Sequence, residues 1–343
     1  MKLFTSLINT IKEHFRLKLI ICFILCAILP LLILGTISYK ISYNIAKDKI
    51  LKETAISCEK NQHLLENRMT QIENLEDSIH FNLCMLCTTA EQPMSNYLDK
   101  LSAVRNNIAS IADSFNIYHV NIFLPDDTFA SKEGLTFCSL SDLKKYKVQL
   151  SDFSKHGLTP NWIFRKDINF PYMVSKGEEP SGVLSCYRYA KINSQKTCLA
   201  VHITSEELSN YLNTFSEGNP SLSYIINSEG VVLSSTDKKQ IGGSLSNEKL
   251  HAITQNLRLS HFSYDKCEII STPVHNQLFL VTETPDYYIR QSSSFLVKMI
   301  FICFMIIVPL TMLSIIWVAD QMTNKINHLS HSMSEIKMDD VID

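Results

Sequence analysis

Two long apolar runs lie near the ends of the chain, and a mixed segment separates them. Neither run, 19–39 or 299–319, contains an Asp, Glu, Lys or Arg. A helix rises about 1.5 Å per residue, so each run spans roughly 30 Å, the thickness of the hydrocarbon layer of a bilayer. The pattern predicts two transmembrane helices with short ends (1–18 and 320–343) and a large segment between them (40–298).

A helical period continues past the first run. Apolar residues recur mostly three, four or seven positions apart on an otherwise polar stretch, at Leu65, Met69, Ile72, Ile79, Leu83 and Leu86. This spacing places them on one face of a helix. We expect Pro93 to end or kink this helix and a second helix to follow from Met94 to about Phe115. Residues 40–114 are therefore expected to form a long helical stalk.

From residue 118 onward, apolar residues recur at every second position, the period of a β-strand. The stretch 118–124 alternates and is rich in β-formers, while 183–192 and 197–203 bracket the polar turn 193–196 and predict a hairpin. A helix start is expected at Ser205. A second set of elements follows, with strands expected at 223–227, 231–235, 267–272 and 278–282, a helix at 248–257, and a sheet end at Pro285. The fold class is therefore α+β, with two modules in tandem.

Composition and charge exclude some classes of protein. The chain is 45% hydrophobic and 19% charged with a net charge of −2, whereas about 25% charged residues is usual in soluble domains. There is no basic run, so no nucleic-acid partner is expected. Four basic residues lie on each side of the first run, so charge does not set the membrane orientation. The run is longer than the core of a signal peptide and is followed by a poor cleavage site, which favours an uncleaved anchor.

Seven cysteines lie between the apolar runs, at spacings that form no dense disulfide framework. One or two bridges are possible, but we expect a fold that does not depend on disulfides. His80, Cys84 and Cys87 share one helix face and could present an imidazole and two thiolates to Zn²⁺ or haem. The alternative is that the cysteines pack as small hydrophobic residues. Because no fourth ligand is evident, no metal and no cofactor is predicted.

Catalytic motifs are missing from the sequence. The nine glycines form no G-x-G or phosphate-binding loop, and there is no G-x-S-x-G sequence. His328 and His331 lack the surroundings of a phosphoacceptor histidine and are interpreted as solvated helix residues. We expect that the chain is not an enzyme.

The last 24 residues carry a heptad pattern. Its apolar positions are spaced 4, 3, 4 and 3, at Met322, Ile326, Leu329, Met333 and Ile336. This is the a/d seam of a parallel coiled coil. The alternative is an amphipathic helix on the membrane surface, which would favour a basic polar face.

Three segments carry a resemblance to a known family. The stretch 224–237, followed by Ile241 and Gly242, resembles the membrane-proximal module of double Cache domains, which are PAS-like extracellular sensors of bacteria. Residues 30–39 resemble the first membrane span of YesM-type sensor histidine kinases. The tail after Ala319 is similar to the start of a HAMP relay, although the Pro usual near the start of a HAMP helix is absent.

The resemblance implies an extracellular sensor in 40–298, with a membrane-distal module at 115–205 and a membrane-proximal module at 206–290. In this family the ligand pocket usually lies in the distal module. Its candidate lining residues here are Trp162, Arg165, Tyr172, Tyr187, Arg188 and Tyr189. Because side chains alternate along a strand, Tyr187 and Tyr189 are expected on one face and Arg188 on the other. The alternative for each residue is packing in the core or on the surface.

The expected function is a membrane sensor of an extracellular small molecule, for which sugars, peptides and organic acids remain open. As implied by the family, the chain would form a homodimer and signal to a cytoplasmic kinase or response regulator in a two-component system, with the kinase part absent from this sequence. The alternatives are a receptor with another output (a chemotaxis receptor, a membrane-bound transcription regulator or a cyclic-dinucleotide enzyme) and a non-signalling surface protein.

Overall fold

A computed structural model describes residues 15–87, 94–125, 136–146, 160–166, 180–192, 195–212, 220–255, 258–275 and 278–339. The chain divides into two compact units. One combines Met1–Ile50 with Tyr287–Asp343, and the other is Leu51–Asp286. Helix α2 (Phe15–Cys87) contributes to both units, and α7 (Asp286–Asp339) lies almost wholly in the first.

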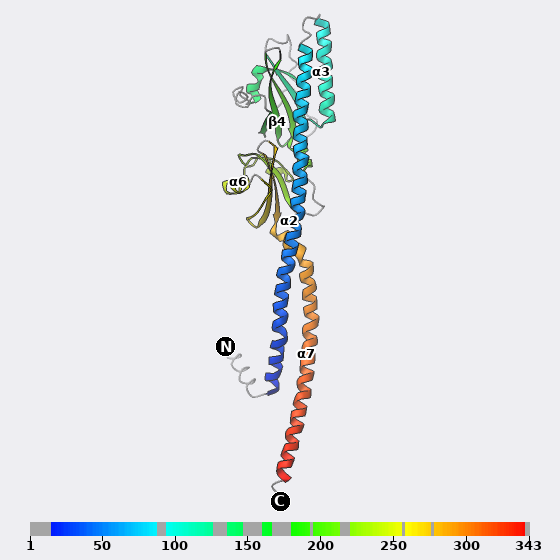
Figure 1. Cartoon of the computed structure of the whole chain (residues 1–343), viewed down its shortest axis with the longest axis vertical. Helices are drawn as coiled ribbons and strands as arrows, with labels where there is room; N and C mark the ends of the chain where they lie inside the picture. The colour runs from blue at the N-terminus through cyan, green and yellow to red at the C-terminus, as the bar shows by residue number, and fades with distance from the viewer. Residues whose placement is uncertain are drawn as a thin grey trace. The chain divides into compact units, whose positions relative to one another are not determined.

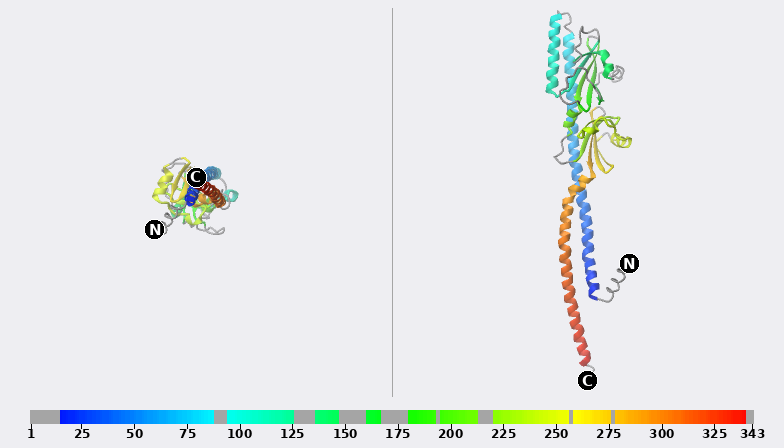
Figure 2. Two further views of the ribbon diagram at one scale, coloured as in Figure 1. Left: turned by 90° about the horizontal axis from the view of Figure 1, so that it is seen from below. Right: turned by 180° about the vertical axis from the view of Figure 1, so that it is seen from behind.

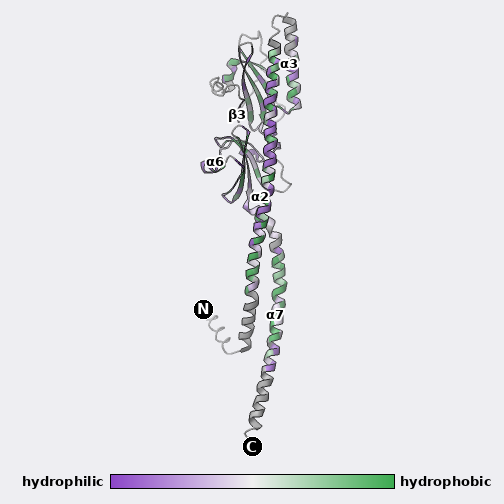
Figure 3. Ribbon diagram, viewed as in Figure 1, coloured by the Kyte–Doolittle hydropathy of each residue, from purple (hydrophilic) through white to green (hydrophobic). Residues whose placement is uncertain are grey.

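In the first unit, α2 and α7 lie side by side (Figures 1 and 2). At Gly35 a Cβ atom would lie 3.3 Å from Phe304 Cε2, so the small residue permits close contact between the two helices. Over the described residues, one helical segment is long and apolar enough to cross a membrane. It is Lys298–Lys325, with a mean hydropathy of 2.8 and no part buried (Figure 3). This segment contains the second apolar run predicted from the sequence.

The first apolar run, 19–39, is helical throughout as part of α2. The side chains before Leu29 lie outside the described residues. Beyond that point large hydrophobic side chains on α2 are exposed, namely Leu29, Leu32, Ile33, Leu34, Ile37 and Tyr39. In the tail, Met322 is exposed, and the side chains of the other four seam residues lie outside the described part.

The second unit contains two five-stranded sheets with the same strand order. The first sheet runs β2–β1–β5–β4–β3, from β1 (His119–Leu124), β2 (Phe137–Ser139), β3 (Asn161–Arg165), β4 (Val183–Ile192) and β5 (Gln195–Thr204). The second sheet runs β7–β6–β10–β9–β8, from β6 (Leu222–Ile226), β7 (Val232–Ser235), β8 (Ser260–Tyr264), β9 (Cys267–Val274) and β10 (Leu278–Pro285). Numbered within each sheet, both orders read 2-1-5-4-3, which confirms the prediction of two α+β modules.

The predicted hairpin is formed by β4 and β5, which pair from Val183↔Thr204 to Ile192↔Gln195. Its two tip residues, Asn193 and Ser194, lie outside the described part. Three strands were not predicted, namely β2, β3 and β8. Each is at most five residues long and lies at a sheet edge, so its sequence carries too little alternation to identify it.

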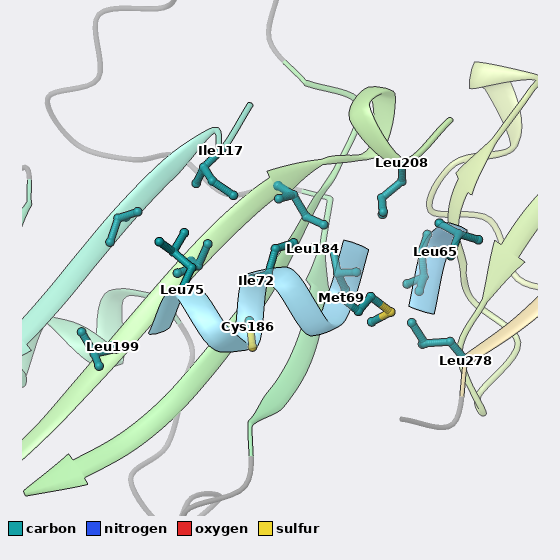
Figure 4. Close-up of a cluster of buried hydrophobic side chains, with 14 of the residues drawn as sticks. Leu65, Met69, Ile72, Leu75, Ile117, Leu184, Cys186, Leu199, Leu208 and Leu278 are labelled. Atoms are coloured by element: carbon teal, nitrogen blue, oxygen red, sulfur yellow. The ribbon is translucent and has the colours of Figure 1, made fainter. Parts of the chain in front are cut away.

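Helix α2 forms a wall of the core of both sheets. The predicted face is buried from Leu65 to Leu83, and it packs in one cluster with Leu184 and Val201 of the first sheet and Leu280 of the second. Figure 4 shows Met69 and Ile72 of α2 among side chains from the first sheet, with Leu278 nearby. Helix α3 (Met94–Ser114) lies alongside α2 (Figures 1 and 2). From Leu51 onward the expected stalk is therefore part of the folded core.

Short helices complete the unit: α5 (Ser205–Asn210), α6 (Asn247–Thr254), η1 (Leu140–Tyr146) and η2 (Lys238–Gln240). Helix α5 starts at the predicted position, because Thr204 Oγ1 accepts from the backbone N–H of Glu207 at 3.1 Å. Ser205 Oγ then donates to the backbone oxygen of Leu233 at 2.5 Å, and Ser234 Oγ donates to the backbone oxygen of Ser205 at 2.6 Å. These reciprocal buried bonds attach α5 to the second sheet.

The cysteines whose side chains the structure describes are free thiols. His80 Nε2 lies 3.7 Å from Cys84 Sγ, and the side chain of Cys87 lies outside the described part. Across the described ranges, no three His, Cys, Asp or Glu residues are arranged to hold a metal ion.

Candidate ligand-binding site

The first sheet has two chemically different faces. One face, here called the helix face, packs on α2 through residues such as Leu184, Cys186 and Val201. The opposite face carries a separate cluster that includes Phe123, Val183 and Tyr187. Side chains alternate along a strand, so each position belongs to one face only.

The opposite face carries a buried polar chain that crosses four strands. Ser185 Oγ lies 2.7 Å from His202 Nδ1, His202 Nε2 lies 2.9 Å from Asn121 Oδ1, and Asn121 Nδ2 donates to Cys138 Sγ at 3.5 Å. An amide oxygen can only accept, so His202 Nε2 carries the proton and Nδ1 accepts from the hydroxyl of Ser185. The four residues lie on β4, β5, β1 and β2.

His202 lies at the centre of the polar chain, and its imidazole is neutral. Burial lowers its pKa well below the usual value of 6.5, and His119 lowers it further. The ring of Tyr187 meets that of His202 edge-on, with centroids 6.0 Å apart, and the ring of His119 is stacked at 6.3 Å. The imidazole of His202 is thus held between two aromatic rings, and its hydrogen bonds fix one tautomer.

Tyr187 and Arg165 lie beside the polar chain, toward the β3 edge. Tyr187 is fully buried, and burial raises its pKa to about 12, with Arg165 acting in the opposite direction. Arg165 pairs in register with Val183, which places it on the same face as Tyr187. Burial also raises the pKa of Tyr189, a half-buried neighbour on this face. We define the candidate site as this face and its residues His119, Asn121, Arg165, Ser185, Tyr187, Tyr189 and His202.

The structure separates the six residues singled out from the sequence. Arg165, Tyr187 and Tyr189 lie on the candidate-site face. Trp162 and Arg188 lie on the helix face, as alternation requires for Arg188. Tyr172 lies outside the described part.

Both helix-face residues contact carboxylates of α2. Trp162 Nε1 donates to Glu73 Oε1 at 3.0 Å. Arg188 Nε lies 3.4 Å from Glu76 Oε2, and its Nη1 donates to Asp77. These contacts join α2 to the sheet, so the two residues are part of the packing against the helix.

Sequence reasoning missed His119, Asn121, Ser185 and His202. Their signal is a polar residue at every second position of a strand that is otherwise apolar, as in His119-x-Asn121 and Ser185-x-Tyr187. On a strand buried on both faces such residues need hydrogen-bond partners, and those come from neighbouring strands. The imidazole of His202 and the amide of Asn121 are buried and bonded to each other, whereas His119, Arg165 and Tyr189 are partly exposed. The groups that this face can present are therefore an imidazole, a guanidinium and a phenol, a combination suited to a small polar molecule.

A separate cavity of about 610 Å³ lies beside α5. It is lined by the end of α3, the turn before β1, and α5, with Lys238 from the second-sheet region. Asp113, Glu206 and Glu207 make it acidic, although Arg68 lies 3.4 Å from Glu207 and offsets part of that charge.

The fold is similar to that of solved periplasmic and extracellular sensory domains. No protein-family model matches the chain, and no curated protein matches it. Among solved structures, the periplasmic sensory domain of the Campylobacter jejuni chemoreceptor Tlp1 is similar, with 15% identity and a TM-score of 0.53 over 70% of this chain and 98% of that one.

Two further solved structures share the fold. The extracellular domain assigned to a histidine kinase, vpHK1S-Z8, has 13% identity and a TM-score of 0.53 over 72% of this chain and 98% of that one. The ligand-binding domain of the C. jejuni chemoreceptor Tlp3, in complex with L-valine, has 13% identity and a TM-score of 0.50 over 73% of this chain and 98% of that one.

Proposed function

We propose that the chain is the sensing part of a transmembrane receptor that binds a small polar molecule outside the cell on the candidate-site face of the first sheet. The observation that carries the proposal is the buried polar chain from Ser185 through His202 to Asn121, set in the fold of sensory domains. A polar chain across the middle of an apolar sheet restricts the sheet to one arrangement, as a preorganised binding surface requires.

Two membrane spans are part of the proposal. Lys298–Lys325 is apolar and unburied, and α2 exposes a row of large hydrophobic side chains from Leu29 to Tyr39. Exposure of either apolar helix surface to water is unfavourable, whereas the hydrocarbon layer of a bilayer accommodates both surfaces. With both spans in place, the second unit lies on one side of the bilayer. We place it outside the cell, with the first sheet in the membrane-distal module, because the solved domains of similar fold are periplasmic or extracellular.

The output proposed is a histidine kinase of the YesM type in a two-component system. The support is the sequence resemblance of residues 30–39 and of the HAMP-like tail, with a homodimer as the signalling state. A chemotaxis receptor or another output remains the alternative, because a sensory domain of this fold also occurs in chemoreceptors. The proposal assigns no catalytic step to this chain.

Two arginines on opposite faces of the same sheet allow a direct test. The full chain in lipid nanodiscs is screened by thermal unfolding against L-amino acids, carboxylic acids, mono- and disaccharides and short peptides. A ligand at 100 times its Kd adds about 2.7 kcal/mol of stability, which raises the Tm by several degrees. Arg165→Gln should remove the shift, whereas Arg188→Gln on the helix face should retain it.

The opposite pattern, with loss in Arg188→Gln alone, would move the binding site to the helix face. Loss of the shift on substitution of Glu206 by Gln, with Arg165→Gln unaffected, would assign the ligand to the cavity beside α5.

A further inference from the structure

One carboxylate oxygen of α2 is shared between the two sheets. Glu73 Oε1 accepts from Trp162 Nε1 at 3.0 Å and from His275 Nε2 at 2.9 Å. Trp162 lies on β3 of the first sheet, and His275 directly follows β9 of the second. We call these three residues the Glu73 bridge. All of them lie within the unit Leu51–Asp286.

The bridge is shielded from water more than an ordinary surface pair. The side chain of Glu73 is 15% exposed and that of His275 is 31% exposed. Hydrogen bonds to an ionised group are shorter and stronger than neutral ones, and shielding raises their contribution further. The bridge therefore contributes more than an exposed ion pair would.

Strand β3 connects the bridge to the candidate site. Alternation places Trp162 on the helix face and Arg165 on the opposite face of the same short strand. Among the described strands β3 pairs with β4 alone, so a shift of β3 strains hydrogen bonds to one neighbour and not to two. Any displacement of β3 caused at Arg165 also moves the indole of Trp162.

A second contact links the end of β3 to the second-sheet region. The side chain of Lys166 passes directly over Gly242, where an added Cβ would lie 2.6 Å from Lys166 Cδ. Gly242 has a φ of +77°, so a glycine suits both the backbone and the close approach.

Within the described residues, other hydrogen bonds join α2 to one sheet at a time, as from Arg188 of β4 to Asp77 and from Thr272 Oγ1 of β9 to Gln62 Oε1 at 2.7 Å, and apolar packing makes up much of the rest of the contact. Leu65, Met69 and Ile72 pack in the cluster that both sheets contribute to. Apolar packing has no directional preference, whereas a hydrogen bond weakens steeply when its distance or angle changes. The Glu73 bridge therefore provides a contact whose energy depends on how the two sheets are placed along the helix.

We infer that Glu73 couples the two sheets through α2, so that a shift of β3 is passed through Trp162 and Glu73 to His275 and the β9–β10 hairpin. The role of this coupling in signalling rests on the function proposed above, whereas the coupling itself is a property of the fold. A ligand that favours one position of β3 would change the relative populations of two arrangements of the second sheet.

The test is hydrogen–deuterium exchange of the full chain in nanodiscs, without any ligand. Trp162→Phe removes the donor and keeps an aromatic ring. It should make the amides of β9 and β10 exchange about tenfold faster, since tenfold corresponds to about 1.4 kcal/mol, near the lower end for a hydrogen bond to a charged group. Ile163→Val, on the same strand but the other face, should leave these amides unchanged.

Two substitutions at position 73 complete a double-mutant cycle between Trp162 and Glu73. In Glu73→Met, β9 and β10 should already exchange faster, and adding Trp162→Phe should have no further effect on them. Glu73→Gln keeps an acceptor oxygen and should restore part of the protection. Equal effects of Trp162→Phe in the wild-type and Glu73→Met backgrounds would overturn the inference, as would an unchanged second sheet in Trp162→Phe. Neither result depends on whether a ligand binds, so failure here is distinct from failure of the proposed function.

Discussion

Arg188 Nε lies 3.4 Å from Glu76 Oε2 at the contact between β4 and α2, and the carboxyl group of Glu76 is fully buried. Burial raises the pKa of Glu76 from its usual 4.5 to about 8, although Arg188 opposes the shift, while Glu73 and Asp77 add to it. The folded protein therefore retains a proton that the unfolded chain loses.

This difference predicts how stability changes with pH. Between pH 4.5 and 8 the folded state binds one more proton at Glu76 than the unfolded state does. The contribution of this group to the free energy of unfolding therefore falls by about 1.4 kcal/mol per pH unit as pH rises through that window, and is constant above it. Glu76→Gln should remove this part of the slope in urea unfolding, whereas Glu59→Gln on the exposed side of α2 should not. Equal slopes in wild type and Glu76→Gln would show that the carboxyl is ionised in the fold.

Asn61 predicts a stabilising substitution. It is fully buried on α2, and within the described residues neither its Oδ1 nor its Nδ2 has a hydrogen-bond partner. Asn61→Leu keeps the same branched shape with two methyl groups in place of the amide oxygen and nitrogen. It should raise the free energy of unfolding by about 1–3 kcal/mol, because two unpaired polar groups are removed from the interior. The exposed Asn67→Leu is the matched control and should change it by less than about 0.5 kcal/mol. A destabilised Asn61→Leu variant would mean that the amide is paired in solution.

Ser185 predicts a loss of stability in the candidate site. Ser185→Ala removes the donor to His202 Nδ1, so a fully buried acceptor is left without a partner. The expected cost is about 1–3 kcal/mol in the free energy of unfolding, measured by urea denaturation. Ser102→Ala on the exposed side of α3 serves as the control. If the free energy of unfolding falls equally little in both variants, the polar chain does not stabilise the sheet.

The heptad pattern of the tail predicts a separation of binding from output. In a chain joined to an active histidine kinase, Leu329→Lys should abolish ligand-dependent phosphorylation, because it places a charge in the seam of a coiled coil. Ligand affinity, measured by thermal shift, should not change. Ser330→Lys lies off the seam and should signal normally. Normal signalling by Leu329→Lys would exclude the seam from the relay.

Long elements with a regular pattern of apolar residues could be predicted from the sequence. The helix face from Leu65 to Leu83 is buried, and the β4–β5 hairpin forms where alternation predicted it. The candidate site was found only in part, since Arg165, Tyr187 and Tyr189 share its face while Trp162 and Arg188 do not. Trp162 was misplaced because β3 is a short edge strand whose existence and phase the sequence did not reveal.

The sequence by itself determined the two charge-free runs, the helical face and the alternation of the longer strands, because each depends on neighbours a few residues apart. Only the tertiary structure decided which residues meet across the sheets. The order β2–β1–β5–β4–β3 brings Asn121 within hydrogen-bonding distance of His202, 81 positions away. Packing of both sheets on α2 likewise brings Trp162 and His275 to one oxygen of Glu73. Such contacts follow from strand order and helix placement, which local periodicity does not encode.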